Sequence, residues 1–209
     1  MKNLAKSVRE NCDPSRSLLS SRHSQIIISL LLIALIFVAR LTPHAANFTP
    51  VAAVGIFAGV YLRGKFAPLL PLIGLFASDI FIGGYGVRGM TIVYGTFLLT
   101  FFAGRLISRG KFANSKLPIK FAKIFSGALI SSILFFLITN NIFLYTPSFY
   151  PMNFAGMIES YVAGIPFWRM QILGDLIYSG ALLGAYEFAK TWLAHREKIR
   201  EIKLAKNHI

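Results

Sequence analysis

The stretch FAKIFSGALISSILFFLITNNIFL, residues 121–144, is the most clearly apolar part of the chain, and Lys123 is its only charged residue. A helix needs roughly 20 consecutive apolar residues to cross the hydrocarbon core of a bilayer. The stretch therefore predicts a membrane-spanning helix. Its charged residue lies at the start of the helix, and Asn140 and Asn141 lie near the opposite end.

Five further apolar runs lie outside this stretch, at about 25–41, 48–62, 66–82, 90–106 and 168–192. Hydrophobic residues make up 55% of the 209 residues and charged residues 14%, which is apolar for a soluble protein. The run at 26–39 could be read as a signal peptide, but the region around 43–46 is a poor cleavage site. We therefore predict an all-α integral membrane bundle of six transmembrane helices. Residues 1–24 form a polar basic tail, 25–193 the membrane domain and 194–209 a basic tail.

The basic residues are distributed unevenly between the two ends of these helices. All but three of the 22 lie on one side of the predicted zigzag, and the exceptions are Arg40, Arg88 and Arg169. Basic residues close to membrane spans stay in the cytoplasm. This predicts cytoplasmic N- and C-termini. The net charge of +14 lies beside apolar runs, where an anionic inner leaflet explains it, so nucleic acid is not an expected partner.

Polar residues inside the predicted spans are costly and indicate function. Asp79, Asp175, Asn140 and Asn141 all fall in the outer part of the membrane, at about 1.5 Å per residue from the outer ends of three spans. Their similar depth predicts a polar pocket that opens outward. Gly55 and Gly59 form a small-xxx-small pair in the second span that would allow close helix packing.

The outer turns add further candidates to this pocket. The first turn contains two prolines, and the third turn, 145–167, is rich in aromatic residues that suit a small, flat, partly polar ligand. Asn153 could cap a short helix over 154–163, which could then lie over the pocket as a lid. The candidate substrate-binding residues are Arg40, His44, Asn47, Asp79, Tyr85, Asn140, Asn141, Glu159, Trp168, Arg169 and Asp175.

A structural role is the alternative for the charged members of this set. Three outer arginines face three acids, Asp79, Glu159 and Asp175, so they could pair as structural ion pairs. No catalytic residue, cofactor or metal is expected. Cys12 is the only cysteine, His44 has no second outer histidine, and the P-loop-like segment 59–66 ends in Phe66 where a hydroxyl is required.

The segment RLTPHAANFTPVAA at 40–53, the Ser78-Asp79 pair, Asn140 and the Gly174-Asp175-Leu176 triplet resemble an uncharacterised bacterial inner-membrane family described as transport proteins. That family is similar in size and layout to the substrate-binding S components of energy-coupling factor (ECF) vitamin transporters. The resemblance implies a solute pocket on the outer side, lined or braced by Arg40, His44, Asn47, Asp79, Asn140 and Asp175. It also implies a location in the bacterial cytoplasmic (inner) membrane, and a transmembrane coupling protein with two ATPases as partners.

Three functions follow from these patterns. The first is non-catalytic capture of a small vitamin-like or heterocyclic solute for uptake. The second is a self-sufficient carrier coupled to protonation of Asp79 or Asp175. The third is an intramembrane enzyme that uses these two acids together, which requires their carboxyl groups to lie close to one another.

Overall fold

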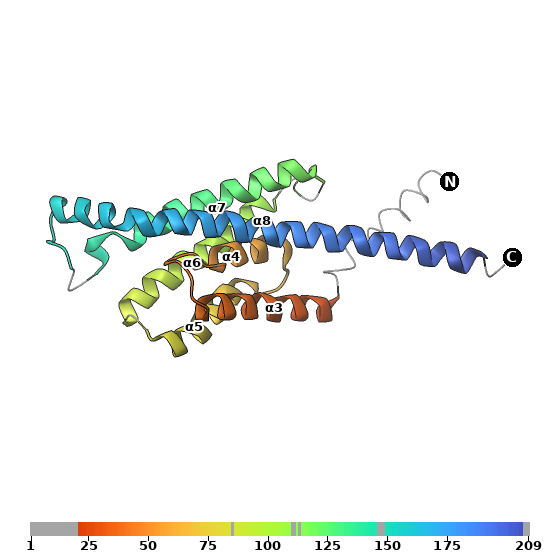
Figure 1. Ribbon diagram of the computed structural model, residues 1–209, viewed down its shortest axis with the longest axis horizontal. Coiled ribbons are helices and arrows are strands. Elements are labelled where there is room, and N and C mark those ends of the chain that lie inside the picture. Colours follow the sequence, from red (N-terminus) through yellow and green to blue (C-terminus); the bar gives the residue numbers. More distant parts are fainter. Residues whose placement is uncertain (1–20, 85, 110–111, 113, 146–148, 207–209) are drawn as a thin grey trace.

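The computed structural model describes residues 21–84, 86–109, 112, 114–145 and 149–206, and every regular element in these ranges is a helix. The prediction of an all-α fold is confirmed. The described residues form six successive α-helices, with two short 3-10 helices between them (Figure 1). They are α3 (Arg22–Leu41), α4 (Val51–Tyr61), η1 (Ala67–Leu69), α5 (Leu70–Ile82), α6 (Val87–Ile107), α7 (Leu117–Thr139), η2 (Ile142–Leu144) and α8 (Phe154–Lys206).

Three of these helices, α3, α6 and α7, are long and apolar enough to cross a membrane. The predicted spans at 48–62 and 66–82 are shorter in the structure. Helix α4 has 11 residues, which is about 16 Å and only half of a typical hydrocarbon core. The apolar helical segment 67–82 is also shorter than a full span. Helix length and hydropathy together define a multi-pass membrane protein.

Helix α4 lies at the centre of the bundle, which explains how so short a helix is accommodated. All of its residues from Val51 to Gly59 are buried, and it packs against α5, α6, α7 and α8. Backbone at membrane depth is tolerated away from a complete span when it is enclosed by protein rather than lipid. The neighbouring helices therefore replace the lipid contacts that a peripheral span would make.

The contact between α4 and α6 depends on glycine. A Cβ atom at Gly59 would meet the backbone of Phe101 and Gly104, and a Cβ atom at Gly104 would meet the backbone of Ile56. Gly55 lies against the side chain of Thr100 in the same way. The prediction of close helix packing at Gly55 and Gly59 is confirmed, and α6 is the partner helix.

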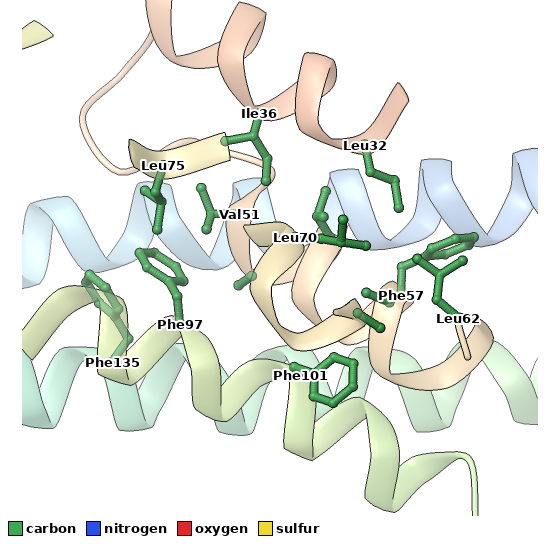
Figure 2. Packing of buried hydrophobic residues seen from close by; sticks show 14 residues of the cluster. Leu32, Ile36, Val51, Phe57, Leu62, Leu70, Leu75, Phe97, Phe101 and Phe135 are labelled. Carbon is green, nitrogen blue, oxygen red and sulfur yellow. The ribbon is translucent and has the colours of Figure 1, made fainter. Parts of the chain in front are cut away.

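The main hydrophobic core joins four helices around α4. Leu32 and Ile36 of α3 point toward α4 and α5, while Phe97 and Phe101 approach from α6 (Figure 2). Many apolar side chains on the outside of the bundle remain exposed, among them Leu30 and Leu31 of α3. In a multi-pass membrane protein such side chains face the lipid, so their exposure is expected.

Helix α8 differs most from the prediction. Asn153 caps it as expected, since its side chain accepts a hydrogen bond of 2.9 Å from the backbone N–H of Gly156. The helix then continues through Pro166 to Lys206 as one element of 53 residues, or about 80 Å. The prediction of a separate short helix over 154–163 is therefore wrong. Figure 1 shows the C-terminal part of α8 projecting well beyond the bundle.

Candidate functional site

Two adjacent cavities lie near the loop 42–50, at the predicted outer end of the bundle. The first has a volume of about 300 Å³ and the second about 260 Å³. Asn47, Phe135 and Gln171 line both, so the cavities share a wall. Polar side chains that line the first are Arg40, His44, Asn47, Thr49, Gln171 and Asp175. The second adds Thr139, Asn140 and Trp168, together with the rings of Phe136 and Phe167.

One face of α8 supplies three polar groups to these cavities. Trp168, Gln171 and Asp175 follow one another at spacings of three and four residues, which places them on the same side of a helix. Gln171 and Asp175 are 4% and 2% exposed. The atoms Trp168 Nε1, Gln171 Nε2 and Asp175 Oδ2 are buried and make no hydrogen bond of regular geometry among the described residues, although the Gln171 side chain lies close enough to Asp175 to interact with its carboxyl group. Buried polar groups without a regular hydrogen bond are unusual in folded proteins, so these three atoms are available for a further contact.

Arg40 and Asp79 form an ion pair between α3 and α5. Arg40 Nη1 lies 2.6 Å from Asp79 Oδ1 and also donates to Ser78 Oγ at 2.6 Å and to the Leu75 carbonyl at 3.2 Å. The other carboxylate oxygen of Asp79 accepts a hydrogen bond of 2.6 Å from the Tyr94 hydroxyl. Both charges are thus matched within the protein. The structural alternative stated for the charged candidates is confirmed for this pair.

The second cavity is bounded by α7, α8 and the residues after α7. Asn140 Nδ2 donates to the Phe136 carbonyl at 2.9 Å, and the Ser160 hydroxyl donates to the Asn140 carbonyl at 2.9 Å. A Cβ atom at Gly164 would clash with the amide oxygen of Asn140, so glycine at this position permits the close approach of that side chain. Trp168 stacks on Phe136 with ring centroids 4.7 Å apart. These contacts hold an aromatic wall beside the Asn140 amide.

The loop 42–50 forms the rim of the first cavity. His44 is exposed, and its Nδ1 atom lies 2.6 Å from the Thr42 carbonyl. Asn47 has a positive φ of 63°, a conformation that asparagine tolerates better than most residues. Gly174 of α8 lets Phe48 and Thr49 pack closely against the helix. The rim of the first cavity therefore packs directly against α8 next to Asp175.

The structure does not bring every candidate residue to the cavities. Asp79 lies behind Arg40 in the ion pair, and Asn141 accepts a hydrogen bond from the Phe143 backbone at 3.1 Å. Glu159 and Arg169 are exposed and line neither cavity. Tyr85 lies outside the described residues. The remaining candidates, Arg40, His44, Asn47, Asn140, Trp168 and Asp175, all line one or both cavities.

Gln171 is a site residue that the sequence analysis missed. It lines both cavities, and its amide nitrogen makes no regular hydrogen bond among the described residues. Its position between Trp168 and Asp175 on one helical face was the available signal. Among the residues that the structure describes, no three His, Cys, Asp or Glu side chains come together as a possible metal site. The cavities are lined by hydrogen-bonding and aromatic groups.

Fold and site together define a multi-pass helical membrane protein with a polar-lined cavity near one end of its bundle. Residues 20–197 match a family of unknown function, DUF6580, and the chain belongs to that family. Searches of curated proteins and of solved structures found no match to the chain.

Proposed function

We propose that this protein captures a small, flat, partly polar solute from the outer side of the membrane for uptake. One observation carries the proposal: the two adjoining cavities contain the atoms Trp168 Nε1, Gln171 Nε2 and Asp175 Oδ2, which make no regular hydrogen bond among the described residues. Small-molecule sites are typically concave, mostly apolar and furnished with a few convergent polar groups. Their typical volume begins near 300 Å³, which is the size of the first cavity alone.

The route to the site and the source of energy follow from two further features. Exposed His44 and Asn47 at the rim give a solute its first polar contacts, and the uneven distribution of basic residues faces this rim outward. The resemblance to ECF S components supports transport driven by a coupling protein with two ATPases. The pairing of Asp79 with Arg40 and Tyr94 supports binding without catalysis, because Asp79 is held in an ion pair while Asp175 has no such partner among the described residues.

Native mass spectrometry of the gently solubilised protein tests this function. We expect a retained small molecule, and we expect the substitution His44→Trp to remove it because His44 is exposed at the rim and lines the first cavity. Ala45→Trp is the matched control, since Ala45 is exposed and lines neither cavity. Absence of any bound molecule from the unmodified protein, or equal retention by both variants, would contradict solute capture at this site.

A proton-coupled carrier is the second candidate, favoured by one observation. Asp175 is a titratable residue of α8 whose side chain is buried in the interior of a membrane protein, and such residues often belong to proton relays. The purified protein alone in liposomes would then accumulate the retained solute in response to a pH gradient, and Asp175→Asn would abolish this dependence. Uptake that needs added ATPase partners and ignores the gradient would favour the first candidate.

A further inference from the structure

We propose that the solute is a cation with N–H donor groups that binds the carboxylate of Asp175. This inference rests on the proposed capture function and names the chemical class of its solute. Asp175 is 2% exposed, lines the first cavity, and its Oδ2 atom makes no hydrogen bond of regular geometry among the described residues. A buried carboxylate needs a positive partner or several hydrogen bonds to offset its desolvation.

The protein itself does not supply that positive partner. Within the described residues, the ion pairs are Arg40 with Asp79 and Lys120 with Glu187, and neither includes Asp175. Arg40 lines the same cavity, but its guanidinium is held by Asp79, Ser78 and the Leu75 carbonyl. The positive charge of Arg40 is therefore neutralised by the negative charge of Asp79. Asp175 is therefore the one unmatched acid among the described residues that line the two cavities.

The walls around Asp175 favour a flat, delocalised cation over a compact one. Phe97 and Phe135 line the first cavity, with their ring centroids 4.8 Å apart. Aromatic faces attract cations, and this attraction is stronger in a site from which water is removed. Gln171, whose side chain interacts with the Asp175 carboxyl group, lines the same cavity and offers its amide to any remaining polar edge of the solute. An amidinium or a protonated amino-substituted heterocycle combines these features, because it has a flat body and N–H groups in one plane.

A neutral solute bound to a protonated Asp175 is the competing possibility. The two alternatives differ in how binding depends on the charge of the ligand at constant shape. Benzamidine, benzamide and benzoate form a suitable probe series, because they share one flat ring and carry positive, zero and negative charge. All three are small enough for a cavity of about 300 Å³.

Trp168 provides the readout for these probes. The chain contains two tryptophans, and Trp192→Phe leaves Trp168, at the second cavity, as the single fluorophore. The variant protein in lipid nanodiscs would be titrated with each probe while Trp168 emission is followed. We expect benzamidine to bind at least about tenfold more tightly than benzamide, as is typical for a desolvated charge pair, and benzoate to bind least.

Two substitutions assign the charge preference to Asp175. Asp175→Asn keeps the side-chain shape and should reduce the preference for benzamidine to less than about twofold. Glu159→Gln removes a charge from an exposed position outside both cavities and should leave the preference unchanged. A preference that survives in Asp175→Asn, or that is equally lost in Glu159→Gln, would overturn the inference.

The result also separates this inference from the proposed function. If benzamide binds as tightly as benzamidine, the inference that the solute is a cation is wrong. Solute capture would remain supported, because the cavity would still bind a flat probe. Failure of benzamidine to bind would also contradict the inference that the solute is a cation. The proposed capture function is tested separately, by the solute retained in native mass spectrometry. A retained molecule that carries no positive charge would likewise contradict the cation inference while supporting solute capture.

Discussion

Replacement of Arg40 by methionine tests the ion pair that links α3 to α5. Methionine keeps most of the length and apolar stem of arginine but removes the guanidinium. In the variant, Asp79 would remain 4% exposed and would keep only the Tyr94 hydroxyl as a hydrogen-bond donor. The variant would lose the ion-pair contact of 2.6 Å between Arg40 and Asp79 and the hydrogen bonds from Arg40 to Ser78 and Leu75.

The expected cost follows from the burial of the two partners. The side chain of Asp79 is 2% exposed and that of Arg40 is 14% exposed. Removal of one partner from a buried pair typically costs about 3–5 kcal/mol, because the other charge is left uncompensated. We expect Arg40→Met to fall in this range. Asp79→Asn should cost less, about 1–2 kcal/mol, because Arg40 keeps two acceptors and its long side chain can reach the membrane surface.

Equilibrium unfolding in mixed micelles, followed by circular dichroism, would measure these free energies. The double variant Arg40→Met/Asp79→Asn provides the control, since it replaces the stranded carboxylate by a neutral amide. We therefore expect the double variant to be more stable than Arg40→Met alone. If the double variant is no more stable than that single variant, or if Asp79→Asn is the costlier single change, the charge argument is wrong.

Two further predictions concern other contacts of the bundle. Gly104→Ala should lower the free energy of unfolding by about 1–3 kcal/mol, because its Cβ would meet the backbone of α4, whereas Gly95→Ala on the same helix meets open space and should be neutral or stabilising in the same assay. Glu187→Gln should lower the thermal unfolding midpoint, because it leaves the buried ammonium of Lys120 without its partner at 2.6 Å. Glu159→Gln is the matched control and should leave the midpoint unchanged; equal shifts in both variants would refute this reading.

The apolar runs and the polar segments that separate them could be predicted from the sequence, because they depend on local composition. The helical class, the close packing at Gly55 and Gly59 and the cap at Asn153 needed no long-range information. The continuity of α8 was not readable in this way. The sequence predicted a short helix over 154–163 that is separate from the span at 168–192, whereas the structure joins the two through Pro166 into one helix that packs against α7.

Local hydropathy thus determined that the chain enters the membrane repeatedly and that its rare polar groups lie at similar depth. Tertiary structure alone decided which of them meet. Arg40 could have paired with any of three acids, and helix packing brought it to Asp79, leaving Asp175 unmatched beside Gln171. The physical reason is that hydropathy sets the depth of a side chain, whereas the rotation of a helix about its axis depends on contacts with its neighbours.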